Sequence, residues 1–295
     1  MPASANIPVT FDLYPRMVVL PSGKLFNAGP QPDTWMFDPS SKSWSLLANM
    51  NAPYRSGEGM VLLPGLGKVL VAGGQASGGG LRTAEIINLS SANPKWVYTG
   101  SMSYGRHDVN LVLLPDGTVL AVGGAQGARA YRKPAKHPEL YNPATERWTV
   151  MAAQKAQRGY HSTALLLPDA RIISAGSDSG PLATTIEIYS PPYLFKGRRP
   201  VVSSAPDSLA YRQSFSITTP DSSSIAKVAL IRADVTTHAN HFEHRYVGLA
   251  FRAGSDQLTA SAPASSTEAP PGYYMLFIVN SLGVPSVAKV LRVVP

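Results

Sequence analysis

One pattern occurs four times in the first 180 residues of this chain. Each copy has an apolar strand, a turn that begins at a proline, a second apolar strand and then one or two glycines. The turn prolines are Pro21, Pro64, Pro115 and Pro168, which lie 43, 51 and 53 residues apart. Proline fixes the first corner of a tight turn, and glycine accepts backbone angles that other residues avoid. Each copy is therefore predicted to form a β-hairpin, and four copies in one register argue against chance similarity.

A third apolar strand follows each hairpin, and the first three units end at a tryptophan. These residues are Trp44, Trp96 and Trp148, whereas the fourth unit reaches Phe195 without one. A repeat of about 50 residues with four strands is typical of a kelch-type β-propeller blade. Residues 1–196 are therefore predicted to form about four kelch-type blades, a partial propeller, in an all-β protein.

The last hundred residues lack this pattern. A basic linker that contains proline, Lys196–Pro200, ends the repeats, and short strands of alternating polarity follow it. About seven strands in about 95 residues is the strand density of an immunoglobulin-like β-sandwich. We therefore expect a second domain, a β-sandwich, over residues 197–295.

Composition excludes several classes of function. The 295 residues contain no cysteine, which excludes disulfides, thiolate metal sites and cysteine catalysis. The net charge is +8, but the basic clusters at Arg129–Lys136 and Lys196–Arg199 are not interleaved with aromatic residues, so we expect solvated loops and no nucleic-acid partner. No apolar run approaches the roughly 20 residues of a membrane span. The first residues have neither the basic nor the apolar region of a signal peptide, so none is expected, and the compartment stays open.

Several stretches are similar to one known family. They are Arg158–Asp169, Thr236–Arg245 and Pro270–Val293, and Tyr14–Pro30 is similar to a mid-propeller blade of bacterial members. On these stretches the chain resembles galactose oxidase and glyoxal oxidase, the copper radical oxidases. The resemblance implies a family fold with a small N-terminal domain, a seven-bladed propeller and a C-terminal sandwich. Since it extends only to the later blades and the sandwich, the chain is expected to be the C-terminal portion of such an oxidase.

The resemblance also implies a copper site. The family holds one copper ion with two histidines and two tyrosines, one of which is cross-linked to a cysteine and stores a radical. Carried over, His161 and His238 are metal ligands, and Tyr160 is the axial ligand and the base for the substrate's hydroxyl proton. The implied reaction, outside the cell, oxidises a small-molecule alcohol, aldehyde or carbohydrate and reduces O2 to H2O2. From the residues alone, a buried aromatic beside a core histidine is the commoner interpretation of Tyr160 and His161, and both reach one metal only if their strand ends there.

This chain departs from the family pattern at several positions. Without cysteine the Tyr–Cys radical cofactor cannot form, and the three remaining ligands do not support a two-electron cycle, so the isolated chain is expected to be inactive. Tyr14 is expected in the core. Arg55 precedes a blade strand and is either a substrate contact or a solvated side chain. His241 and His244 stand where the family usually has Asn and Gln, which puts the partners of the copper ligands in doubt.

Two other functions fit the residues. One is a non-catalytic kelch and sandwich module that binds carbohydrate or protein, because a fold alone does not select a function. The other is a zinc hydrolase at His238, His241 and His244 with Glu243 nearby, although histidines clustered in a loop are usually solvated. Four blades with the curvature of seven are expected to form an open arc, whose exposed edges favour self-association. A smaller closed ring and a gene fragment are the alternatives.

Overall fold

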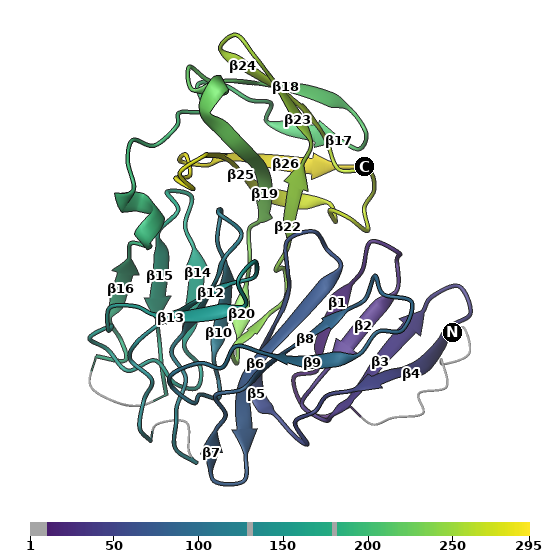
Figure 1. Cartoon of the computed structure of the whole chain (residues 1–295), viewed down its shortest axis with the longest axis vertical. Helices are drawn as coiled ribbons and strands as arrows, with labels where there is room; N and C mark the ends of the chain where they lie inside the picture. The colour runs from purple at the N-terminus through teal and green to yellow at the C-terminus, as the bar shows by residue number, and fades with distance from the viewer. Residues whose placement is uncertain (1–10, 129–131, 179–181) are drawn as a thin grey trace.

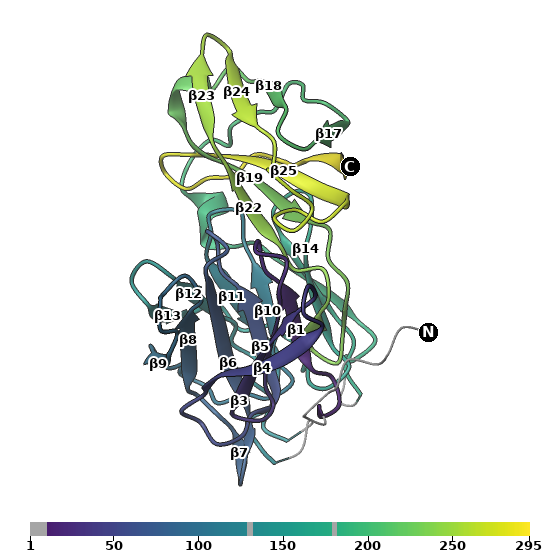
Figure 2. The same ribbon diagram turned by 90° about the vertical axis from the view of Figure 1, so that its right-hand side faces the viewer.

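The computed structural model describes residues 11–128, 132–178 and 182–295 of an all-β protein. β-Blades form one half of the molecule, and a sandwich of two sheets stacks on top of them (Figures 1 and 2). The basic cluster at 129–136 and the N-terminal residues considered for a signal peptide lie partly or wholly outside the described residues. Among the residues described, no helix is long and apolar enough to cross a membrane.

Four antiparallel sheets form the blades, each built from strands consecutive in sequence. The first two sheets contain β1 (Arg16–Val19), β2 (Leu25–Ala28), β3 (Asp33–Asp38) and β4 (Ser43–Asn49), then β5 (Ser56–Leu62), β6 (Lys68–Ala76), β8 (Ala84–Asn88) and β9 (Trp96–Thr99), with short β7 (Gly79–Gly80) beside β6. The third and fourth contain β10 (Asn110–Leu113), β11 (Val119–Val122), β12 (Glu139–Asn142) and β13 (Arg147–Val150), then β14 (Thr163–Leu166), β15 (Ile172–Ala175) and β16 (Ile186–Tyr189). The predicted kelch-type blades are thus present, and the unit without a tryptophan has three strands in the described part of the chain.

The predicted proline turns join the first two strands of every blade. In each, the residue before the proline donates its N–H to a carbonyl four or five residues later, at 2.8–2.9 Å; the donors are Leu20, Leu63, Leu114 and Leu167. The glycines after the second strand lie where the next blade approaches. A β-carbon on Gly73 would lie 2.4 Å from the Arg106 carbonyl oxygen, and one on Gly123 would lie 2.4 Å from that of Arg158. Glycine is therefore required at these two positions by close packing as well as by positive φ.

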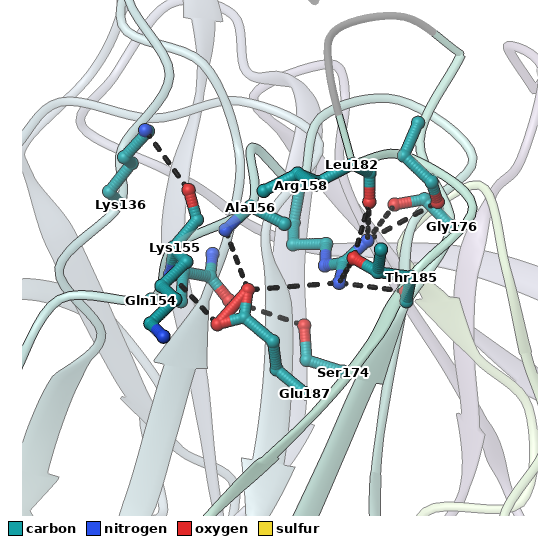
Figure 3. Close-up of polar contacts among 11 residues, drawn as sticks. Lys136, Gln154, Lys155, Ala156, Arg158, Ser174, Gly176, Leu182, Thr185 and Glu187 are labelled. Atoms are coloured by element: carbon teal, nitrogen blue, oxygen red, sulfur yellow. Dashed lines mark hydrogen bonds and ion pairs between the residues drawn. The ribbon is translucent and has the colours of Figure 1, made fainter.

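Three blades share an arginine–glutamate ion pair that the repeat pattern did not predict, and in two of them both side chains are fully buried. An arginine before the first strand faces a glutamate on the third: Arg106 Nη2 lies 2.7 Å from Glu139 Oε1, and both side chains are fully buried. The arginine also donates to the glycine carbonyl that ends the second strand, and the glutamate accepts two backbone N–H groups from the preceding loop. The same arrangement links Arg158 and Glu187 at 3.8 Å in the fourth blade (Figure 3). Each pair thus fastens three segments of one blade together.

Arg55 belongs to this series. Its Nη2 lies 2.8 Å from Glu85 Oε1, its Nη1 donates to the Gly73 and Thr83 carbonyls, and its side chain is fully buried. A solvated Arg55 is therefore wrong, because this buried side chain binds Glu85 and two carbonyls within the second blade. The arrangement gives no support to a substrate contact through Arg55.

Two further sheets form the predicted sandwich. It has eight strands, against about seven expected, and a hairpin: β17 (Ser208–Ala210), β26 (Lys289–Val294), β25 (Gly272–Asn280), β19 (Ile225–Arg232) and β22 (Tyr246–Leu249) form one sheet, and β18 (Ser214–Thr218), β24 (Gln257–Ser261) and β23 (Phe251–Gly254) form the other. The predicted boundary at 196/197 falls between a short 3-10 helix, η1 (Pro192–Phe195), and β17.

Strand β19 is buried on both of its faces. Val228 and Leu230 pack between the two sheets of the sandwich, whereas Ala229 and Ile231 pack into the core of the blades. Successive strand residues point to opposite sides, so a strand between two cores needs an unbroken apolar run. The blades therefore share one packed core with the outer face of this sandwich sheet, next to the separate core between the two sandwich sheets.

Polar contacts fix the same interface at the proline turns. Tyr246 Oη and Lys227 Nζ donate to the carbonyls of Pro115 and Asp116, and Thr267 Oγ1 donates to that of Pro21. Between β19 and β22 the chain leaves the sandwich as a hairpin, β20 (Thr236–Thr237) and β21 (Asn240–His241), which descends among the blades (Figure 1). There it contacts β5, β10 and β14, the first strands of three blades.

The outermost strand of the fourth blade, β16, exposes apolar side chains. Ile186 is 63% exposed and Ile188 is 43% exposed. Figure 1 shows the blades around the descending hairpin, with β4 and β16 at opposite sides. Self-association through open edges such as β16 stays a prediction.

Candidate metal centre

The structure brings Tyr160, His161 and His238 together. Tyr160 and His161 lie in the turn before β14, and His238 lies at the tip of the β20–β21 hairpin. The Nε2 atoms of the two histidines are 2.8 Å apart. The Tyr160 ring lies 4.0 Å from the His161 ring and 5.3 Å from the His238 ring, centroid to centroid. A blade and the sandwich thus each contribute an imidazole to one point.

Unusual backbone angles produce this meeting. His161 and His238 have φ values of 61° and 53°, and Ala239 has 54°. Such left-handed angles are uncommon outside glycine and occur often at functional sites. Because Tyr160 and His161 lie in a turn rather than an extended strand, their rings need not point to opposite faces. Tyr160 and His161 can therefore both reach one metal, as the sequence analysis required, because no strand runs through them.

The other ring nitrogens of both histidines have partners. His161 Nδ1 makes a short contact with Asp178 Oδ1, and His238 Nδ1 lies 2.9 Å from Thr237 Oγ1. With a proton on each Nδ1, each Nε2 keeps a free lone pair; with the proton of one ring on Nε2 instead, that nitrogen donates to the other. Metal-binding histidines commonly have such a carboxylate or hydroxyl partner.

Copper fits this pair of nitrogens. Two ligands about 2.0 Å from one ion and at right angles to each other are about 2.8 Å apart, which is a neighbouring pair in tetragonal coordination. The observed Nε2–Nε2 distance is 2.8 Å. In the tautomers that have both protons on Nδ1, the two Nε2 lone pairs repel each other at this distance unless a cation or a proton lies between them. The donor set of two imidazoles and a phenol suits Cu(II).

A second tyrosine, Tyr14, lies at this centre. Its ring stacks on His238 with centroids 4.2 Å apart and an angle of 16° between the planes. Tyr14 is 38% exposed, so the expectation that it packs in the core is wrong. The sequence did contain a signal for this placement. Tyr14 precedes β1 just as Tyr160 precedes β14, so each tyrosine stands just before the first strand of its blade.

The phenol of Tyr160 is held in its protonated form. A hydrogen bond with Tyr14, together with burial and the nearby carboxylates of Asp108 and Asp178, raises the pKa of Tyr160 to about 12. At neutral pH, Tyr160 therefore keeps its proton in the absence of a metal, and its phenolate would be a strong base.

An open cavity of about 330 Å3 lies beside the centre. Three tyrosines line it, Tyr14, Tyr54 and Tyr160, and the carboxylates of Glu58 and Asp108 also face it. Arg55 is not among its lining residues. The cavity therefore combines aromatic faces with buried acidic groups next to the two histidines.

Charged groups are buried at the back of this cavity. Arg16 Nε lies 3.5 Å from Glu58 Oε1, and both side chains are almost fully buried. Burial raises the pKa of Glu58 to about 7, although the Arg16 charge opposes the shift. Beside them, His107 Nδ1 lies 2.8 Å from Asp108 Oδ2.

Stability is expected to fall as pH rises through the interval set by Glu58. Its pKa is about 7 in the folded protein against 4.5 as the ordinary value, so the folded state binds more protons between these values. The stabilisation is complete below about pH 4.5 and is lost as pH rises through 7, and a shift of this size corresponds to roughly 3 kcal/mol. Urea unfolding at pH 5 and pH 8 measures the difference. Glu58→Gln should remove the difference in unfolding free energy between the two pH values, and Asp256→Asn, at an exposed residue, should retain it. An equal difference in all three proteins would contradict the assignment to Glu58.

The remaining histidines of the hairpin do not join His238. His241 and His244 stack on each other with centroids 4.5 Å apart, and their side chains are only 3% and 8% exposed. The expectation that this cluster is solvated is wrong, because the hairpin is inserted among the blades. The group of three possible metal ligands found in the described residues contains Asp234 in place of His238.

Two family models match this chain. Glyoxal oxidase N-terminus matches residues 6–193, and Galactose oxidase-like, Early set domain matches residues 199–293. Together they cover the blades and the sandwich.

Curated relatives and a solved structure agree with these matches. Aldehyde oxidase GLOX of Vitis pseudoreticulata is 31% identical over 96% of this chain and 62% of its own length. Galactose oxidase of Gibberella zeae is 31% identical over 77% of this chain and 36% of its own length. A fungal alcohol oxidase in complex with copper has a TM-score of 0.85 at 29% identity, over 96% of this chain and 63% of the other. This chain therefore spans less than two thirds of these relatives, and it belongs to the glyoxal oxidase and galactose oxidase family.

Proposed function

We propose that this chain binds one copper ion through His161, His238 and Tyr160, as the C-terminal part of an oxidase site for a small alcohol, aldehyde or carbohydrate. The observation that carries the proposal is the 2.8 Å approach of two Nε2 atoms whose Nδ1 atoms both have partners. The names of the relatives, aldehyde oxidase, galactose oxidase and a copper-containing alcohol oxidase, support this substrate class. An extracellular location stays a prediction.

Bound copper would accept an electron from the substrate. The chain's own residues would orient the substrate and handle its proton. Tyr160 lines the same cavity as Tyr14 and Asp108 and is hydrogen-bonded with Tyr14, so a proton leaving Tyr160 would pass to a nearby carboxylate, such as that of Asp108, or to solvent in the open cavity. Once deprotonated, Tyr160 Oη would accept the hydroxyl proton of a substrate alcohol. The three tyrosine faces would exclude water from one side of that alcohol.

We also propose that this chain alone does not sustain catalytic oxidation. Removing two electrons from an alcohol requires a second one-electron acceptor beside copper, and the sequence has no cysteine to form a Tyr–Cys cross-link. Tyr14 lies close to the centre but has no thiol to bind.

A non-catalytic binding module is the second candidate. The tyrosines lining the cavity favour it, because aromatic faces and polar groups together suit the flat surface of a sugar ring. This candidate predicts carbohydrate binding that does not depend on copper or on the two histidines.

Copper titration tests the proposal. All proteins carry His241→Asn and His244→Gln, which removes the other pair of neighbouring imidazoles. In this background, His161→Ala and His238→Ala should each weaken Cu2+ binding by at least about 100-fold, since each removes a ligand and not only a ligand's partner. His137→Ala, a histidine bonded to the Met151 carbonyl, is the matched control.

Affinity that is indifferent to both alanine variants would favour the binding module. A separate assay follows peroxide production from the copper-loaded chain with a primary alcohol. Steady turnover would contradict the proposed inactivity, while leaving the copper assignment intact.

A further inference from the structure

A second cluster of metal-binding groups lies at the base of the inserted hairpin. Asp234 follows β19, His241 lies in β21, and His244 lies just before β22. The chain leaves the sandwich near the first residue and returns near the last. These three residues therefore lie where the excursion begins and ends, whereas His238 lies at its tip.

The Asp234 carboxylate organises this cluster. Its Oδ1 accepts the backbone N–H groups of Val235 and Glu243, at 2.8 and 3.0 Å. Its Oδ2 lies 2.5 Å from His241 Nδ1 and 3.7 Å from His244 Nε2. One oxygen is thus occupied by backbone donors, and the other faces two imidazoles.

Hydrogen bonds do not account for both rings. His241 Nε2 and His244 Nδ1 are buried and have no hydrogen-bond partner among the described residues. Buried polar atoms normally have partners, because an unmade hydrogen bond is costly in the interior. Hydrogen bonds within the described residues therefore leave one nitrogen of each ring unaccounted for.

We propose that Asp234, His241 and His244 bind a divalent transition-metal ion, with Zn2+ as the best match, at a site separate from the centre formed by His161 and His238. One ligand atom from each residue lies within 4.8 Å of the other two. Two imidazoles and a carboxylate are a common ligand set for zinc, which takes a fourth ligand to complete a tetrahedron.

The charge states agree with this geometry. Burial lowers the pKa of His244 to about 3, so its ring is neutral at physiological pH and has one nitrogen lone pair. Burial alone would raise the pKa of Asp234, but the two imidazoles and the Glu243 N–H lower it below its ordinary value. An ionised carboxylate and a neutral imidazole are the forms that bind a metal.

Space for a fourth ligand adjoins the cluster. A cavity of about 230 Å3 is lined by His241, His244 and Glu243, among others. His244 Nε2 now accepts the Leu113 N–H at 3.1 Å, so metal binding through this nitrogen would release one backbone hydrogen bond. That loss is small beside the binding free energy of a structural zinc site. The ion would hold the two ends of the hairpin together. It would thereby fix the orientation of the hairpin and the position of His238 at its tip.

Zinc titration of the full chain tests this site. The background carries His161→Ala and His238→Ala, so the other centre is removed. After chelator treatment, one Zn2+ per chain is expected to bind, and Co2+ should give the visible absorption bands of a tetrahedral site. Asp234→Asn and His241→Asn should each weaken binding by at least about 100-fold, and His137→Asn should not.

Two results would overturn the proposal. One is the absence of stoichiometric Zn2+ binding in the background protein. The other is an affinity that Asp234→Asn and His241→Asn leave unchanged, which would make the cluster a hydrogen-bonded pair only. If Asp234→Asn does not fold, the ring resonances of His241 and His244 give the answer in the background protein: they should shift on Zn2+ addition, and unchanged resonances would refute the site.

Discussion

Replacing Glu139 with glutamine is expected to lower the free energy of unfolding by about 3–5 kcal/mol, because it leaves the buried Arg106 charge without its partner. Both side chains are fully buried, and their nitrogen and oxygen are 2.7 Å apart. The carboxylate also accepts the Ser103 and Tyr104 N–H groups, at 2.6 and 3.1 Å. An amide of the same shape can accept from these donors less well and turns an N–H group toward one of them.

The equivalent pair of the fourth blade gives the matched control. Glu187 is 25% exposed and lies 3.8 Å from Arg158, so Glu187→Gln should cost less than half as much. Urea unfolding followed by tryptophan fluorescence measures both, since Trp148 lies on β13 of the third blade. Equal losses in the two variants would contradict the view that burial of the pair determines its contribution.

Copper is expected to stabilise the folded chain by about 4 kcal/mol when its free concentration is about 1,000 times its Kd. The physical reason is that His161 belongs to the fourth blade and His238 to the sandwich hairpin, so the pair exists only while the two are docked. Thermal unfolding with and without Cu2+ measures the gain, in protein that carries His241→Asn and His244→Gln. The gain should fall to about 1.4 kcal/mol or less in His238→Ala, whose Kd is at least about 100-fold higher, and persist in His137→Ala.

Copper that stabilises His238→Ala as much as the parent would place its binding elsewhere. A gain that is reversed by chelator and strongly reduced in both His161→Ala and His238→Ala would show that the ion links the two domains. Because the blades and the sandwich also share a packed interior, the domains should stay docked without copper.

The fold was predictable because its signals are local and repeated. A turn proline, a glycine and two apolar runs specify a hairpin within about 15 residues, and four copies specify blades. The buried Arg–Glu pairs were not predicted, since an arginine and a glutamate about 30 residues apart carry no local pattern. Yet Arg55, Arg106 and Arg158 all stand just before a blade's first strand, and this shared position was a signal available in the sequence. Its neglect left only a substrate contact and a solvated side chain as interpretations of Arg55.

The centre was predictable only where the family resemblance reached. Tyr160, His161 and His238 came from motifs, and the structure brings them together. Tyr14 was missed because its stacking on His238 joins residues more than 200 positions apart. The burial of His241 and His244 was missed because it depends on how deeply the hairpin enters the blades, which no local sequence pattern specifies.

The most direct test of the account counts the nitrogens bound to copper. Electron paramagnetic resonance of protein loaded with one Cu2+, again with His241→Asn and His244→Gln, should show coupling to two imidazole nitrogens. His161→Ala and His238→Ala should each leave one. A two-nitrogen signal that survives both substitutions would contradict the claim that a blade and the sandwich hold a single copper ion between them.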